Sequence, residues 1–182
     1  MSAEDDIPDL ASDDPELLRR LNVACGRTIR TWALLEILLV EYLQLALGVD
    51  KFRARVVWLS LPNFSSRRLL LLNLSKTYCS QEAHSKFEKL LKRCSRLASQ
   101  RNKLAHALSG VDAESGKVFF MSDQKHSDIG TDFMNQELIT LNNIEGWPDA
   151  IHEIRKDLLE WRDTFGRSVQ ASPRQNWPSE DT

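Results

Sequence analysis

The sequence has few cysteines, no long apolar run and no basic segment near its start, and each absence excludes a class of protein. Its three cysteines, Cys25, Cys79 and Cys94, form no Cys-x-x-Cys pair, so we expect reduced, mostly buried thiols. Residues 34–47, the longest apolar stretch, fall short of the roughly 20 residues of a membrane span and include two glutamates. Residues 1–16 carry seven acids and no base, the opposite of a signal peptide. We therefore expect a cytoplasmic protein with no membrane partner.

Several catalytic signatures are also missing from the sequence. It contains no glycine-rich phosphate loop, no Gly-x-Ser-x-Gly and no His-Glu-x-x-His. The four histidines lie far apart without metal-ligand spacing. We therefore expect no metal and no cofactor, and we expect His84, His126 and His152 to be solvated or structural surface residues.

What is present fits one ordinary folded domain. The chain has 182 residues, of which 42% are hydrophobic and 27% charged, as in soluble proteins of one compact domain. Residues 1–13 form an acidic tail and residues 170–182 a second tail without periodic pattern, so the domain is expected over residues 14–169. The apolar periodicity predicts a mainly all-α fold, an antiparallel bundle of four to five helices, with a small β-hairpin at about residues 117–141 before the last helix.

Local signals place the ends of these helices. Asp14 followed by Pro15 predicts the start of a long first helix, and Gly48 predicts its end. Further caps are expected at Asp50, at Ser65 or Ser66, and at Ser80, which would open a long helix closed by Gly110. The last helix is expected to begin near Pro148, and the tryptophans Trp32, Trp58 and Trp161 are expected in the core or at an interface.

The charges are distributed unevenly along the chain. Residues 51–108 contain thirteen bases and two acids, a net charge of +11. Such a block can bind a polyanion through phosphate contacts, or it can simply solvate helix faces. If the partner is RNA, the expected contacts are Lys89, Lys92, Arg93, Arg96 and Lys103.

Residues 99–107, SQRNKLAHA, carry the most informative pattern. Arg101 falls within the apolar stripe of its helix, and Asn102 and His106 are four apart, on one helix face. Arginine can hold a phosphate with its planar fork of donors, and histidine can transfer a proton near neutral pH. These groups suffice for metal-free RNA cleavage by the ribose 2′-hydroxyl. Alternatively, the three residues cap carbonyls, pair with a buried carboxylate and pack, without catalysis.

This segment resembles the signature of the HEPN superfamily, an arginine and a histidine separated by four to six residues, often with asparagine after the arginine. Arg101, Asn102 and His106 match the four-residue version at the end of a long helix, and the tract from Trp32 to Glu36 adds to the likeness. Ala107 stands where many members have glycine. The resemblance implies a homodimeric, metal-independent endoribonuclease whose Arg101, Asn102 and His106 are catalytic residues, although some members only bind or act as scaffolds.

Glu36 lies in register with the apolar stripe of the first helix, where an unpaired carboxylate would be costly to bury. One reading, favoured by the resemblance, is a supporting residue that orients Arg101 or His106. The other is an edge position that faces water.

The sequence thus leads to two functional hypotheses. The first is a HEPN-like ribonuclease acting as a toxin or as an effector of stress or defence, with RNA, a second copy of itself and a cognate inhibitor protein as partners. The second is a non-catalytic HEPN-like module for dimerisation and interaction. An apolar surface on the first helix, formed by Leu34, Leu38 and Leu45, favours a homodimer in either case.

Overall fold

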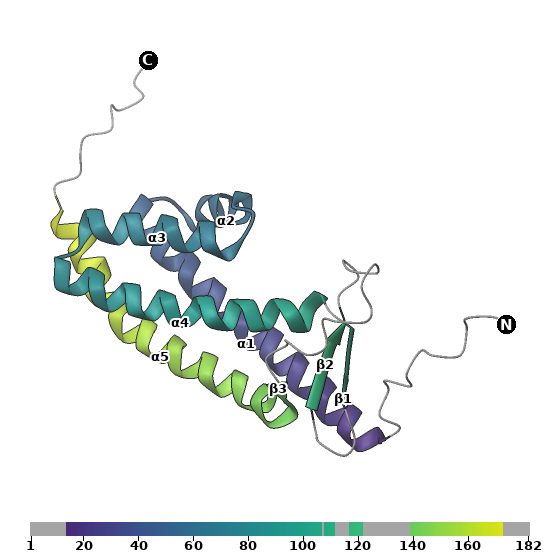
Figure 1. Ribbon diagram of the computed structural model, residues 1–182. Helices are drawn as coiled ribbons and strands as arrows, with labels where there is room; N and C mark the ends of the chain where they lie inside the picture. The colour runs from purple at the N-terminus through teal and green to yellow at the C-terminus, as the bar shows by residue number, and fades with distance from the viewer. Residues whose placement is uncertain (1–13, 107, 112–116, 122–138, 173–182) are drawn as a thin grey trace. The chain divides into compact units, whose positions relative to one another are not determined.

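The computed structural model describes residues 14–106, 108–111, 117–121 and 139–172. It is mainly α-helical, as expected, with five helices and a small sheet before the last helix (Figure 1). The helices and strands follow in the order α1 (Pro15–Leu47), α2 (Lys51–Ser60), α3 (Phe64–Tyr78), α4 (Gln81–His106), β1 (Leu108–Val111), β2 (Lys117–Met121), β3 (Ile139–Thr140) and α5 (Leu141–Ala171). The predicted tail at residues 1–13 lies outside the described residues, and α5 continues two residues past the predicted domain end at residue 169.

Polar caps set most helix starts. Asp14 Oδ1 accepts hydrogen bonds from the amides of Glu16 and Leu17, and Asp50 does the same for α2, both as predicted. Gly48, with a φ of 65°, follows α1 in the left-handed conformation that favours glycine. The predicted cap of α3, at Ser65 or Ser66, was wrong. The cap is Asn63, which directly precedes the helix and whose Oδ1 accepts a hydrogen bond from the Ser66 amide, whereas both serines already lie inside the helix.

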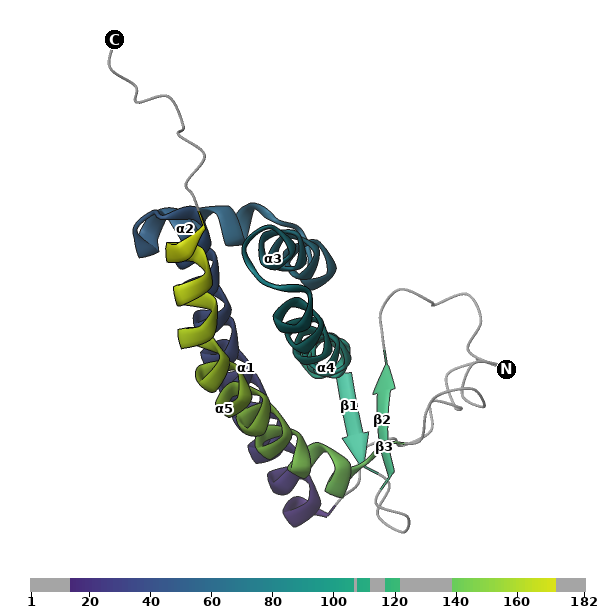
Figure 2. The same ribbon diagram turned by 90° about the vertical axis from the view of Figure 1, so that its left-hand side faces the viewer.

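The sheet differs from the predicted hairpin. Residues 108–111, expected at the end of a helix, form β1, which pairs antiparallel with β2, and β2 pairs with β3 (Figure 2). Helix α4 therefore ends at His106 rather than at Gly110. Residues 122–138, which make up most of the hairpin predicted at about residues 117–141, lie outside the described residues.

Helix α5 begins at Leu141, seven residues before the predicted start at Pro148, which lies inside the helix. The cause is a reciprocal cap, since Asn143 Oδ1 accepts the Thr140 amide and Thr140 Oγ1 accepts the Asn143 amide.

The chain divides into two compact units, and α1, α4 and α5 each contribute to both. The first unit comprises the described parts of residues 1–33 and 97–152, including the sheet. Its core contains Leu21, Trp32, Leu104, Val118, Ile144 and Trp147.

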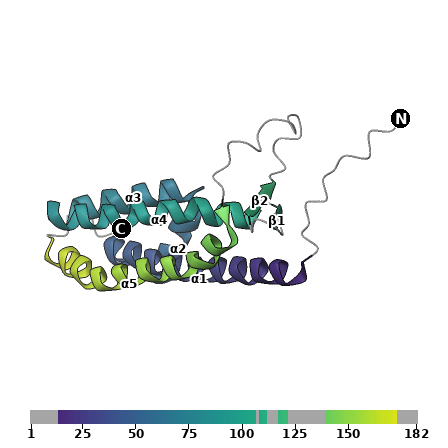
Figure 3. The same ribbon diagram turned by 60° about the horizontal axis from the view of Figure 1, so that its bottom comes forward.

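The second unit comprises residues 34–96 and the described part of residues 153–182. Its core is an aromatic cluster from α1, α4 and α5, in which the Phe87 and Trp161 rings stack with centroids 4.2 Å apart. Tyr42 packs against both rings and donates a hydrogen bond to the carbonyl of Leu158. Helix α3 and the first half of α4 lie side by side (Figure 3), where Ser75 Oγ and His84 Nδ1 are 2.8 Å apart. Trp32, Trp58 and Trp161 are buried, as expected for core residues.

Among the described residues, no single helix is long and apolar enough to cross a membrane. Helices α1 and α2 meet the criteria of length and composition only when taken together, and they are bent by 111° relative to each other.

Candidate functional site

The Arg-Asn-x-x-x-His motif occupies the last two turns of α4, in the first unit. Arg101 is half-buried, and Asn102 and Lys103 are exposed. His106 is the last residue of the helix, and its side chain lies outside the described part of the chain. The helix thus places the motif where the resemblance implied, at the end of a long helix.

The guanidinium of Arg101 has one hydrogen-bond partner among the described residues. Its Nη1 donates a hydrogen bond to Asn102 Oδ1 at 3.0 Å. Its Nε is buried and has no hydrogen-bond partner among the described residues. An arginine carries five N–H donors, and one of them, on Nη1, has an acceptor among the described residues. A phosphate group, which accepts two parallel N–H bonds, matches that geometry.

Asn102 and His106 are one helical turn apart, so their Cβ atoms lie on the same face of α4. Asn102 accepts a hydrogen bond from one amino group of Arg101 through its side-chain oxygen, and its side-chain N–H groups have no acceptor among the described residues. The backbone therefore brings an arginine, an asparagine and a histidine to one helix end.

Glu36 has a partner, and that partner is an arginine of α3. Arg67 Nη1 donates to Glu36 Oε1 at 2.8 Å, with the two side chains 17% and 23% exposed. The same guanidinium donates from Nε to the Trp58 carbonyl and from Nη2 to the Leu61 carbonyl, and it lies 5.2 Å from the centre of the Trp58 ring. Glu36 therefore balances the charge of Arg67, which holds the end of α2 through hydrogen bonds to its carbonyl groups. Of the two readings of Glu36, the edge position that faces water is wrong. The other reading, a residue that orients Arg101 or His106, stays a prediction.

The candidate RNA contacts on α4 fall into two groups. Lys89, Lys92 and Arg96 are exposed in the second unit, and Lys103 is exposed in the first. Arg93 forms an ion pair with Asp157 of α5. The three bases at spacings of three and four share one face of α4, as a backbone-binding surface requires. Arg93 differs from them because a carboxylate already occupies its guanidinium.

Lys89 also lines a hollow of about 420 Å³ in the second unit. The other lining residues are Lys86, Leu90, Asp157, Glu160, Trp161 and Thr164. Two lysines and two carboxylates surround the Trp161 ring, so the lining residues of this hollow have no net charge.

The remaining histidines and the cysteines form no group of metal ligands in the part of the chain that the structure describes. His84 is half-buried against Ser75 rather than on the surface, His152 is exposed, and His126 lies outside the described residues. Among the described residues, no three His, Cys, Asp or Glu side chains are grouped to hold a metal ion. Cys94 is buried, and Cys25 and Cys79 are half-buried free thiols. Burial raises the pKa of Cys94 to about 12.

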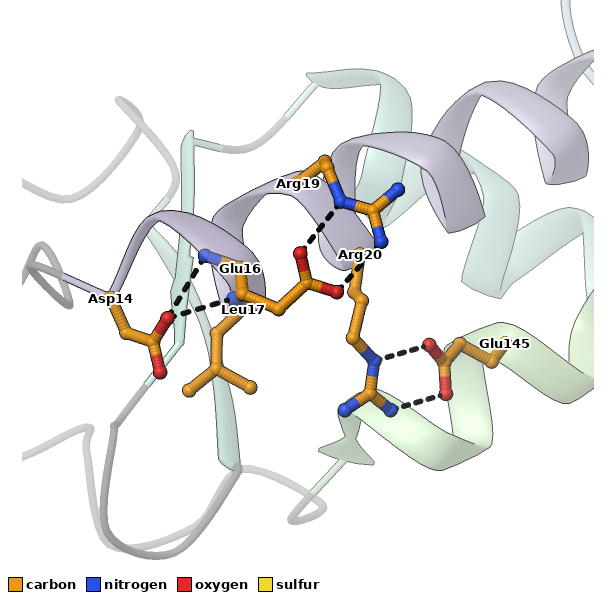
Figure 4. Close-up of polar contacts among 6 residues, drawn as sticks. All are labelled: Asp14, Glu16, Leu17, Arg19, Arg20 and Glu145. Atoms are coloured by element: carbon orange, nitrogen blue, oxygen red, sulfur yellow. Dashed lines mark hydrogen bonds and ion pairs between the residues drawn. The ribbon is translucent and has the colours of Figure 1, made fainter.

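The sequence analysis missed an arginine cluster in the first unit. Arg19, Arg20 and Arg27 line a hollow of about 250 Å³ together with Glu145. Figure 4 shows Arg19, Arg20 and Glu145 with their polar contacts. The signal was present in the sequence, because residues 17–33 contain four arginines and no acid. It was overlooked because the acidic residues 1–16 precede it and the larger basic block follows.

Comparison with protein-family models, with curated proteins and with solved structures gave no match. The fold and site therefore define a mainly α-helical bundle protein with an arginine, asparagine and histidine motif at the end of α4.

Proposed function

We propose that the protein is a HEPN-like, metal-independent endoribonuclease. The observation that supports this most directly is the state of Arg101, whose guanidinium is bonded to Asn102 and whose Nε has no hydrogen-bond partner among the described residues. In the proposed reaction, Arg101 holds the scissile phosphate and Asn102 donates to one of its oxygens. His106 removes the proton from the ribose 2′-hydroxyl, which attacks the adjacent phosphorus, while the bond from phosphorus to the 5′-oxygen breaks and the 5′-oxygen takes a proton from water.

The wider proposal makes the protein a cytoplasmic homodimer that acts as a toxin or as a stress or defence effector, with an inhibitor protein as a further partner. Exposed apolar side chains on the second-unit part of α1 support the homodimer: Leu34, Ile37 and Leu45 are 40%, 46% and 37% exposed. Leu38, expected on the same surface, is buried. Light scattering at micromolar concentration tests this part, and a strictly monomeric mass would count against it.

The deciding experiment compares the wild type with His106→Ala on RNA in the presence of EDTA. We expect the wild type to cleave and to leave 2′,3′-cyclic phosphate ends, because the nucleophile belongs to the substrate. We expect the variant to lose cleavage while its helix content and melting temperature stay nearly unchanged. Products with 5′-phosphate and plain 3′-hydroxyl ends would exclude the mechanism.

A second candidate function, a non-catalytic interaction module, is favoured by helix α2. Its buried side carries Ala54 and Trp58, yet the opposite side exposes Phe52, Val56 and Leu59, which are 76%, 53% and 60% exposed. Apolar anchors at i, i+4 and i+7 are typical of a helix that docks in a groove of another protein. Under this proposal His106→Ala has no effect on RNA, and Phe52→Ser removes partner binding.

A further inference from the structure

Helix α2 carries an apolar stripe on the side opposite the one that packs against the protein. Phe52, Val56 and Leu59 are each more than half exposed, and their spacing places them on one face of the helix. The buried residues Ala54 and Trp58 lie on the other side. We call the three exposed residues the α2 stripe. Neighbouring exposed apolar side chains rimmed by polar residues are typical of an interaction surface.

Basic side chains border the α2 stripe on both sides. At about 100° per residue, Arg55 falls along one edge of the stripe and Arg53 along the other, and both are exposed. Arg53 contacts Asp50 at 3.3 Å, whereas Arg55 forms no ion pair with a described residue. Residues 51–81 contain six bases and no acid. A partner that fits this face therefore combines apolar side chains with carboxylates.

One segment of the chain itself has this composition. Residues 1–13, which lie outside the described residues, contain five acids and no base. Ile7 and Leu10 stand among these acids, three positions apart. The other long segments outside the described residues, 122–138 and 173–182, each contain a base. The acidic segment is therefore the one that complements both the charge and the apolar character of α2.

From this match we infer that the α2 stripe binds residues 4–13 of a second copy of the chain. Ile7 and Leu10 pack against the stripe, and the neighbouring carboxylates face Arg53 and Arg55. Exposed ion pairs add little affinity, so the apolar side chains supply most of it and the charges set the orientation.

A second copy is the source because the same unit exposes further apolar residues on α1, the surface that supports the homodimer. Reciprocal exchange of the segments gives two such contacts in one dimer, so each contact can be weak by itself. The inference rests on the second candidate function, the interaction module, and names its partner.

The first test titrates a fluorescently labelled peptide of residues 1–14 into the full-length double variant Ile7→Ser/Leu10→Ser, whose own segment no longer competes. We expect saturable binding that weakens with added salt. Adding Phe52→Ser to the receptor should weaken binding about tenfold, because a large apolar contact is lost. Adding Leu69→Ser is the matched control, since it removes an apolar side chain that is 59% exposed on α3, outside the stripe. It should leave the affinity unchanged. A peptide with Ile7→Ser and Leu10→Ser keeps every acid and should also bind about tenfold more weakly.

The second test asks whether the contact joins two copies. Labelled full-length Phe52→Ser keeps its acidic segment, and unlabelled Ile7→Ser/Leu10→Ser keeps its α2 stripe, so this mixture retains one intact contact. A mixture of labelled and unlabelled Phe52→Ser retains none, while any contact through α1 is common to both mixtures. We expect tighter association in the first mixture, with unchanged helix content by circular dichroism in every variant.

Three results would overturn the inference: no binding of the peptide, equal binding with and without Phe52→Ser, or equal association in the two mixtures. Each would leave an interaction module with a different protein as partner. RNA cleavage that is lost in His106→Ala would instead count against the interaction module, and it leaves these binding measurements unaffected.

Discussion

Arg67 and Glu36 form an ion pair across 31 residues of sequence, and the same guanidinium holds the carbonyls of Trp58 and Leu61. Three acceptors, one from α1 and two from the end of α2, thus bind one side chain. The pair is mostly shielded from water, so removal of either partner leaves a poorly compensated charge.

We expect Glu36→Gln and Arg67→Gln each to lower the free energy of unfolding by about 1–3 kcal/mol. The double variant should lose less than the sum, because the second substitution removes a group that has already lost its partner. Urea denaturation of the four proteins measures this coupling. RNA cleavage, measured under conditions in which all four proteins are folded, supplies a second readout. If the cleavage rate falls in Glu36→Gln and not in Arg67→Gln, Glu36 also orients Arg101 or His106.

Arg101→Lys separates the two functional proposals. Lysine keeps the charge and loses the two-pronged geometry, so a ribonuclease should slow by about 10- to 1000-fold with little change in RNA affinity. In an interaction module the substitution should instead lower stability by about 1–3 kcal/mol, through polar groups left without partners. Single-turnover cleavage, RNA titration and thermal melting of this one variant distinguish the two results.

The basic face of α4 contains a matched pair of neighbours for testing RNA contact. Lys92 is exposed and Arg93 is paired with Asp157. Lys92→Glu should weaken RNA binding and reduce the log–log salt slope by about one per lost phosphate contact, with no effect on melting. Arg93→Glu places two acids together, so its main effect should be a lower melting temperature. If both variants weaken RNA binding equally, the bases attract RNA through their summed electrostatic field rather than through defined contacts to phosphates.

Burial of Cys94 predicts a loss of stability in alkaline solution. In the unfolded chain this thiol ionises near its ordinary pKa, whereas in the folded protein its pKa is about 12. Above the lower pKa the unfolded state therefore holds fewer protons than the folded state, and stability falls by about 1.4 kcal/mol per pH unit for this group. Cys94→Ala should make the decline between pH 9 and 10 shallower in chemical denaturation. An unchanged slope would contradict the assignment.

The sequence was sufficient for the helical class and for most helix starts, because caps such as Asp14 and Asp50 act on amides two or three residues away. It failed at β1, where Leu104 and Leu108 continue the helical spacing and only pairing with β2 turns the chain into a strand. The predicted start of α5 was wrong because Pro148 is a strong sequence signal for a helix start, whereas the reciprocal cap of Thr140 and Asn143 is visible only in the structure. The motif could be located from spacing, whereas the Glu36 partner could not, since periodicity within one helix carries no information on which helix packs beside it.

Arg101 and His106, to which we assign phosphate binding and proton transfer in the proposed reaction, differ in how the backbone holds them. Arg101 lies five residues inside α4, whereas His106 ends the helix and is joined through Ala107 to β1, whose Val111 pairs with Val118 of β2. A ligand that distorts the strands would therefore act on the backbone of the histidine before it reaches the arginine. In a ribonuclease of this design, a change in the sheet would slow proton transfer by His106, while phosphate binding by Arg101 would stay unchanged.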